Sequence, residues 1–222
     1  MTTVRAQHRN QVMFDGRVLI TGGFDSSGNP LGSAEIYTYN TQTGTGTFSA
    51  TAGSMASARY GHRMNNVGVG EVLVTGGFGA GGVALASSEL FNPALGGSFT
   101  APASASLAHA RGHHFSNTLP TGEILVTGGH AGGAALNSTE LYNPDTGTFT
   151  AGATLNQARQ SHSSSLLPNG LVLISGGNTS SSTDLDIQTN FLASAELYDR
   201  KTNSFTATGS KNNATTGGSS IL

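Results

Sequence analysis

The stretch RYGHRMNNVGVGEVLVTGG, residues 59 to 77, decides the fold because its spelling returns three more times along the chain. In each copy an arginine is followed by a histidine three residues later and by a pair of glycines 17 residues later. The repeated arginines are Arg5, Arg59, Arg111 and Arg159, at intervals of 54, 52 and 48 residues. Four copies of a period of about 50 residues predict a propeller or solenoid.

The residues within one copy predict four short antiparallel strands, named a to d in chain order. The Arg/His segment gives strand a, and an apolar run such as Val72-Leu73-Val74, directly before the glycine pair, gives strand b. Tight-turn spellings such as Asn169-Gly170 join these two strands as a hairpin. A Glu-x-Tyr or Glu-x-Phe segment gives strand c, and a lone phenylalanine such as Phe149 marks strand d.

Composition limits the function classes. The net charge is -2 and charged residues make up only 10% of the chain, so there is no basic bias toward nucleic acid. Cysteine is absent, which excludes disulfides, thiolate metal sites and a cysteine nucleophile. No apolar run reaches the roughly 18 residues that a membrane helix requires, so we expect no membrane insertion.

The combination of these motifs resembles the kelch family of β-propellers over residues 1 to 205. The chain departs from the family in lacking tryptophan and using phenylalanine on strand d, as some bacterial members do. The resemblance implies an all-β, kelch-type β-propeller with four four-stranded antiparallel blades. We predict blades at about 1–49, 50–100, 101–150 and 151–205, with residues 206–222 as a tail or as strand a of a fifth blade.

Most ionisable residues of the repeat are predicted to be structural. Glutamate disfavours strands, so a Glu at the same strand c position of every copy needs a partner, and the repeated arginine supplies one. The glycine pair indicates positive φ or close passage past a neighbouring backbone. Function is therefore expected outside these positions.

The b-to-c and d-to-a connections crowd onto one face of a propeller, which makes that face the candidate site. The connections are residues 24–33, 78–87, 130–138 and 178–194, with 49–58, 100–110 and 150–158. Three histidines outside the repeat, His109, His113 and His130, lie at the ends of two neighbouring strands of copy three. They are candidates for a Zn or Cu site, or for ordinary surface polar groups; apart from this site we expect no cofactor.

Further binding candidates lie in the same connections. The b-to-c connection of copy four is the longest and carries Asp184, Asp186 and Phe191, which suits either binding specificity or simple tolerance of an insertion. Two carboxylates at this spacing are also a candidate Ca²⁺ site, although a calcium loop normally has more oxygen ligands. Phe24 and Phe78 follow glycine pairs and could stack on a ligand or pack in the core.

Two function classes stay open. The first is a non-catalytic recognition module that binds a glycan or protein on the loop face; the second is a structural or assembly unit of a cell-surface or filamentous protein, with a kelch-fold enzyme less favoured. Composition favours an extracellular or cell-surface location in a bacterium. Because four blades and one extra strand make an unusual ring, we also expect a second copy, or further blades of a longer chain, to complete it.

Overall fold

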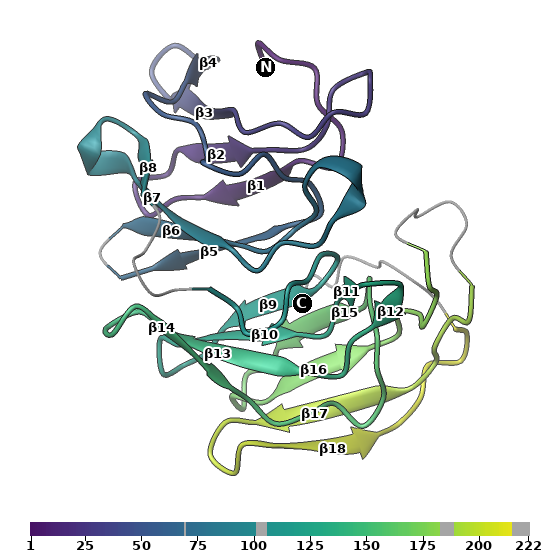
Figure 1. The fold of residues 1–222 in the computed structure, drawn as a ribbon. Helices are drawn as coiled ribbons and strands as arrows, with labels where there is room; N and C mark the ends of the chain where they lie inside the picture. The colour runs from purple at the N-terminus through teal and green to yellow at the C-terminus, as the bar shows by residue number, and fades with distance from the viewer. Residues whose placement is uncertain (69, 101–105, 183–188, 215–222) are drawn as a thin grey trace.

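The computed structural model describes residues 1–68, 70–100, 106–182 and 189–214. Its strands form four antiparallel sheets of four strands each, which follow one another along the chain as blades. Figure 1 shows blades one and two in the upper half of the molecule and blades three and four in the lower half. The all-β, kelch-type propeller architecture predicted from the repeat is confirmed.

The strand bounds follow the repeat. Blade one comprises β1 (Arg9–Val12), β2 (Val18–Thr21), β3 (Ala34–Asn40) and β4 (Thr45–Ala50). Blade two comprises β5 (Arg63–Val67), β6 (Glu71–Thr75), β7 (Ser88–Asn92) and β8 (Ser98–Thr100). Blade three comprises β9 (Phe115–Thr118), β10 (Ile124–Thr127), β13 (Thr139–Asn143) and β14 (Thr148–Ala151). Blade four comprises β15 (Ser163–Leu166), β16 (Val172–Ser175), β17 (Ala195–Asp199) and β18 (Ser204–Thr208).

Three connections carry structure that the repeat did not predict. The b-to-c connection of blade three forms a small hairpin, β11 (His130–Ala131) with β12 (Ala134–Ala135). Blade two carries two single-turn 3-10 helices, η1 (Ala80–Gly82) and η2 (Pro93–Leu95). Within the described ranges there is no helix long and apolar enough to cross a membrane.

The hydrophobic core lies between blades. Leu73 of β6 points toward blade three, where it packs in one cluster with Ile124, Val126 and Tyr142. Corresponding clusters join blade one to blade two and blade three to blade four. Alternate residues of strand b therefore face opposite neighbours, which explains why the run is apolar without alternation.

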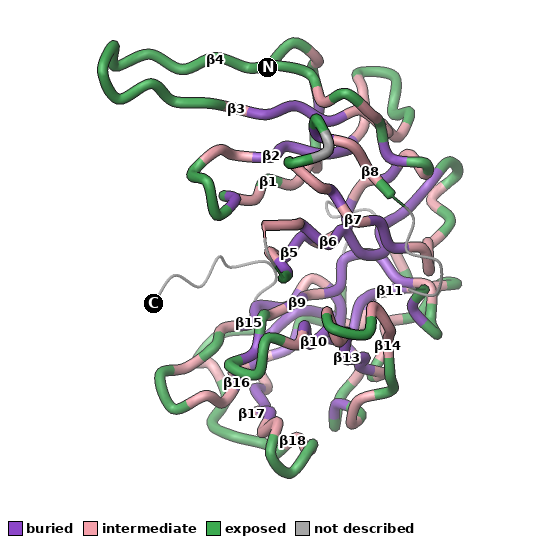
Figure 2. Tube along the Cα trace, turned by 90° about the vertical axis from the view of Figure 1, so that its left-hand side faces the viewer, coloured by how far each residue is buried: buried purple, intermediate pink, exposed green. Residues whose placement is uncertain are grey.

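The blades fan outward from their first strands. The inner strands are in contact in series, β1 with β5, β5 with β9 and β9 with β15. Figure 2 shows the blades following one another down the view, with buried segments concentrated in the second and third strands of the blades and exposed ones in β4 and the turns. We call the face with the b-to-c and d-to-a connections the loop face, and the face with the a-to-b and c-to-d turns the turn face.

The backbone beyond blade four continues the repeat for a few residues. The amide of Lys211 donates to the carbonyl of Ala193. In the preceding blades the amides of Met55, Leu107 and Leu155 make the corresponding bond to the b-to-c connection, to Gly32, Ala86 and Asn137. Lys211 therefore occupies the position that precedes strand a in the earlier copies. Residues 215–222 lie outside the described residues.

Candidate functional site

The repeated arginine and glutamate form the predicted ion pair. The Nη2 of Arg111 donates to Oε1 of Glu140 at 2.8 Å, and both side chains are fully or almost fully buried. The Nη1 of Arg111 donates to the carbonyls of Gly128 and Ser138, and Nη2 also donates to the Ser138 hydroxyl. Every charge is thus matched by several hydrogen bonds, which a buried ion pair requires.

The same arrangement returns in all four blades. The Arg–Glu distances are 3.1, 2.7, 2.8 and 2.9 Å in chain order. Each glutamate also accepts two backbone amides from the segment that precedes the repeat arginine, for example those of Ala108 and His109 on Glu140. The ion pair therefore holds the loop-face connection in place, and the prediction that Arg and Glu are structural is confirmed.

The repeated histidines lie between blades. The Nε2 of His62 is 2.7 Å from the Thr21 hydroxyl of the preceding blade, and that hydroxyl donates to the sulfur of Met64. The hydroxyl must therefore accept from His62 Nε2–H, which leaves Nδ1 as an unprotonated lone pair. His114 and His162 contact Thr75 and Thr127 in the same way. Burial lowers the pKa of all three histidines well below the usual value, so they are neutral.

Aromatic side chains form a row across the loop face. Phe24 of blade one meets Tyr60 edge-on at a centroid distance of 5.6 Å, and Tyr60 meets Phe78 at 5.5 Å. Phe78 in turn contacts His113 at 4.9 Å and His130 at 6.3 Å. The row joins three successive blades near the first strands; Phe24 and Tyr60 are half-buried, whereas Phe78, His113 and His130 are buried.

The sequence-predicted binding residues have unlike environments. Phe24 is half-buried, Phe78 is fully buried within the row, and Phe191 is 47% exposed at the end of the long connection. Phe78 is therefore a packing residue, one of the two roles that the sequence left open. Asp184 and Asp186 lie outside the described residues.

The three candidate metal ligands each make a different set of contacts. His109 has a side chain that is 60% exposed, with Nδ1 3.9 Å from Glu140. His113 and His130 are buried on either side of Phe78, and His130 Nε2 donates to the carbonyl of Ser181 at 3.1 Å. Across the described part of the chain, no group of three His, Cys, Asp or Glu side chains is arranged to hold a metal ion. His113 thus packs against Phe78 and His130 anchors a loop, whereas the His109 side chain is exposed.

Several loop-face residues were missed by the sequence reasoning. Gln160 is fully buried, and its Nε2 donates to the carbonyls of Ser180 and Ser182, which fixes the start of the long connection of blade four. Tyr60 and Gln160 each follow a repeat arginine, a position held by Ala6 and Gly112 in the other copies. The signal available in the sequence was that the residue after the repeat arginine differs among otherwise matching copies.

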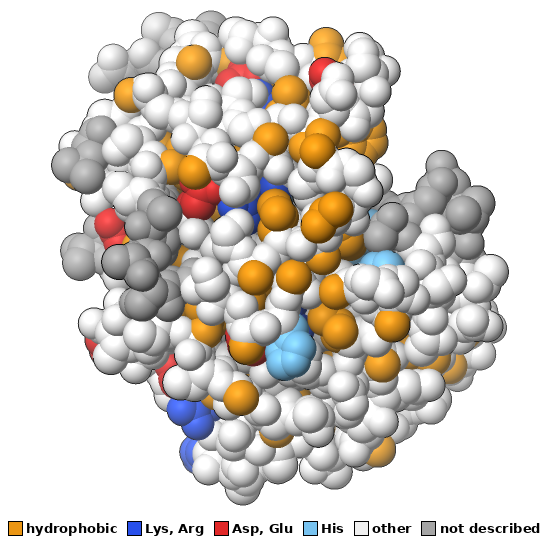
Figure 3. Space-filling model, viewed as in Figure 1, with side chains coloured by type: hydrophobic (Ala, Val, Ile, Leu, Met, Phe, Trp, Pro, Cys, Tyr) orange, Lys and Arg blue, Asp and Glu red, His pale blue; other side chains and the backbone are white. Residues whose placement is uncertain are grey.

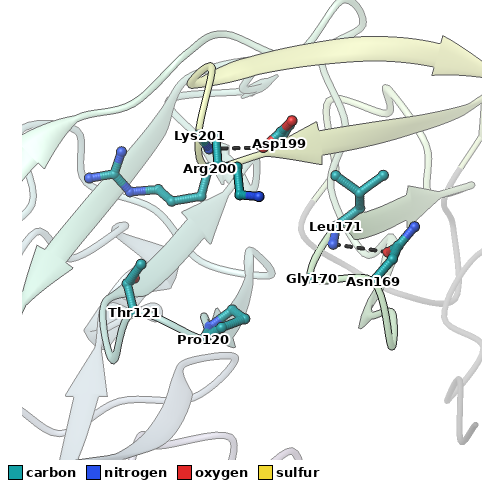
Figure 4. Close-up of a pocket in the computed structure, with 8 residues that line it drawn as sticks. All are labelled: Pro120, Thr121, Asn169, Gly170, Leu171, Asp199, Arg200 and Lys201. Carbon is teal, nitrogen blue, oxygen red and sulfur yellow. Dashed lines mark hydrogen bonds between the residues drawn. The ribbon is translucent and has the colours of Figure 1, made fainter.

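A cavity of about 620 Å³ lies on the turn face between blades three and four. Pro120 and Thr121 line one side and the Asn169–Leu171 turn the other, while the Asp199–Lys201 turn covers the space (Figure 4). Arg200 extends toward blade three, where it forms an ion pair with Glu123 at 2.7 Å. This cavity is lined by turns, whereas the sequence placed the site on the opposite face.

Comparison with known proteins identifies one of the four repeats. Residues 111–156, which run from the repeat arginine of blade three past β14, match the Kelch motif family. No curated protein matches the chain.

Proposed function

We propose that this chain, a kelch-repeat protein, is a non-catalytic recognition module that binds a protein partner through the loop face. Kelch repeats build protein-interaction modules in general. The observation that carries the proposal is the Phe24–Tyr60 end of the aromatic row, which is only half-buried and spans blades one and two on the face where the variable connections lie. Aromatic side chains contribute large contact areas at interfaces.

Apolar side chains at the tips of the connections support the same face. Val83 is 65% exposed and Phe191 is 47% exposed, each in a b-to-c connection. In the view of Figure 3 charged side chains are few, and hydrophobic side chains lie among uncharged side chains and backbone. A protein partner would cover these apolar tips on binding.

Capture of partners by the immobilised chain tests the proposal. Val83→Asp and Phe191→Ser change exposed loop-face residues, whereas Phe14→Ser changes an aromatic side chain on the turn face that is 69% exposed. We expect a captured protein to be lost with both loop-face variants and retained with Phe14→Ser. Equal capture by all variants, or loss with Phe14→Ser alone, would contradict a loop-face partner. Binding of all variants to a glycan array, with no protein captured, would favour a glycan partner instead.

A second candidate, an assembly unit, is favoured by the outer face of blade one. The Tyr37–Phe48 pair there is partly exposed, while the matching Phe91, Tyr142 and Tyr198 of the other blades are buried against a preceding blade. An apolar blade face with no neighbour suits contact with another blade, from a second copy or a longer chain. In the assembly role we expect concentration-dependent association without added ligand.

A further inference from the structure

The outer strand of blade one differs from the outer strands of the other blades. β4 has six residues, whereas β8, β14 and β18 have three, four and five. Every residue of β4 is exposed. Figure 2 shows the β3–β4 hairpin extending beyond β1 and β2 of the same blade. In the described part of the chain, blade one therefore presents the longest and most exposed outer strand.

The outer edge of β4 carries backbone groups that no strand of the chain uses. The amide of Thr51 donates to the carbonyl of Ala34, so alternate residues of β4 turn their backbone groups toward β3. The amides and carbonyls of Gly46, Phe48 and Ala50 consequently point outward. β4 is the last strand of its sheet, and among the described residues no further strand pairs with this edge.

The usual protection of a sheet edge is missing at β4. Charged residues and proline commonly keep exposed edges from pairing with another chain. The c-to-d turn of blade two contains Pro93, that of blade three contains Asp145, and that of blade four contains residues 199–201, Asp-Arg-Lys. Residues 36–58, which include β4 and the turn before it, contain no charged residue, histidine or proline. Neither repulsion nor a missing amide therefore opposes a strand that pairs with β4.

The side chains of β4 fit a second β4 in antiparallel register. With Phe48 on the twofold axis, each Phe48 lies opposite its own copy and Gly46 lies opposite Ala50, so small side chains flank the two rings. Tyr37 already contacts Phe48 on the same face of the sheet, at a centroid distance of 4.9 Å. Pairing would thus place four aromatic rings side by side, and aromatic cross-strand pairs stabilise sheets.

We infer that the outer edge of β4 binds a second copy of the chain by antiparallel pairing of β4 with β4. The occupant is a second copy because one twofold register gives partners to the outward amides and carbonyls of both strands at once, as a self-complementary interface requires. The inference leaves the loop-face function untouched. It rests on the second candidate, the assembly role, and specifies the contact that this role would use.

Sedimentation velocity of the whole chain over a range of concentrations tests the contact. We expect the parent chain to pass from monomer to dimer as the concentration rises. Phe48→Lys places two like charges on the twofold axis and should weaken the dimer at least tenfold. Thr206→Lys is the matched control, because it adds the same charge to an exposed residue of β18 and should leave the dimer unchanged. A parent chain that is monomeric at every concentration, or equal weakening by both variants, would overturn the inference.

A proline separates strand pairing from contact through the apolar face of blade one. Ala50→Pro removes an outward amide but leaves the hydrogen bonds between β3 and β4, and proline is tolerated at such edge positions. This variant should weaken the dimer at least tenfold, with an unchanged melting temperature. A dimer that survives Ala50→Pro at full strength would assign the contact to the blade face and overturn strand pairing.

Cysteine cross-linking tests the register without depending on the stability of the proline variant. The chain has no cysteine, and in the proposed register Thr47 lies opposite Ser49 of the second copy. Under oxidation, a mixture of Thr47→Cys and Ser49→Cys chains should form covalent dimers faster than either variant alone. Equal rates in the mixture and in the separate variants would overturn the antiparallel register.

The proposals fail in different ways. Loss of the dimer in Phe48→Lys with partner capture unchanged would leave the loop-face function standing. A dimer that is lost in Phe48→Lys but retained in Ala50→Pro would keep the assembly role without strand pairing. A monomeric parent chain that captures another protein, with capture lost in Ala50→Pro, would assign the β4 edge to a foreign strand and overturn the second copy.

Discussion

The arginine at the centre of each blade is the residue on which the blade depends most. Arg111 donates five hydrogen bonds, which reach the d-to-a connection, the glycine pair, the b-to-c connection and strand c of blade three. Arg111→Ala should lower the free energy of unfolding by about 3 kcal/mol, and Glu140→Ala by a similar amount, because each leaves a buried charge unpaired. Thermal or denaturant melting measures both losses.

The control for this prediction is an exposed pair in the same chain. Arg17 and Asp15 also form an ion pair, but both side chains are substantially exposed. Arg17→Ala should therefore change the free energy of unfolding by no more than about 0.5 kcal/mol. Losses below that size for Arg111→Ala and Glu140→Ala would show that the buried pair is not what holds the blade.

The repeated histidines make stability depend on pH. Burial lowers the pKa of His162 well below its usual value, so the folded chain binds this proton less readily than the unfolded chain. The stabilisation is complete above the unfolded pKa of about 6.5 and is lost as pH falls toward the folded pKa, by up to about 1.4 kcal/mol per pH unit for each such histidine. The free energy of unfolding should therefore fall between pH 7 and 5.5. This fall in the free energy of unfolding should be shallower in His162→Gln. It should be the same as in the parent chain in His109→Gln, where the substituted side chain is exposed. Parallel curves for all three proteins would contradict the account.

At the scale of the element, the glycine pair sets how closely blades approach. Gly128 has φ of 55°, and a Cβ there would collide with the carbonyl oxygen of Arg159 in the next blade. Gly129, beside it, donates its amide to that same carbonyl at 2.9 Å. The pair thus combines a left-handed backbone with an inter-blade hydrogen bond, which only glycine permits without strain.

A matched pair of substitutions separates these two effects. Gly128→Ala combines left-handed strain with a clash and should destabilise the chain by about 3 kcal/mol, whereas Gly147→Ala should cost about 1 kcal/mol from left-handed strain alone. Gly147 has φ of 66° but open space where a Cβ would lie. Denaturant melting of both variants decides the matter. Equal losses would mean that the approach of neighbouring blades is not limited at Gly128.

The elements were predictable from the sequence because their signals are local. Strands b and c, the hairpin turns and the Arg–Glu partnership repeat at fixed spacing, so one copy explains the others. The contacts of Arg9 and Arg63 were not predictable, since each arginine donates to a backbone carbonyl of the next blade, that of His62 or His114. The same holds for His130, whose partner Ser181 is 51 residues away in the sequence. The spacing of residues within one copy predicts the strands of a blade. Contacts between copies depend on how neighbouring blades stack, which the spacing does not give.

At the scale of the whole molecule, stability should vary from blade to blade because the core lies between blades. Leu73 of β6 and Leu125 of β10 are fully buried, with a neighbouring blade on either side of each sheet. Every residue of β4 is exposed, and Phe48 on it is 39% exposed. Blade one therefore has fewer inter-blade contacts than blades two and three, and we expect it to open at a lower free energy.

Hydrogen exchange followed by mass spectrometry measures this difference directly. Peptides covering β3 and β4 should exchange faster than peptides covering β6 and β10, because opening blade one breaks a single inter-blade core. If the outer face of blade one also binds a second copy, exchange in β3 and β4 should slow as the protein concentration rises, and Phe48→Ser should abolish that dependence without changing β6 or β10. Uniform exchange across the blades would show that the chain opens as one cooperative unit and that the exposed face of blade one is stable without a neighbour.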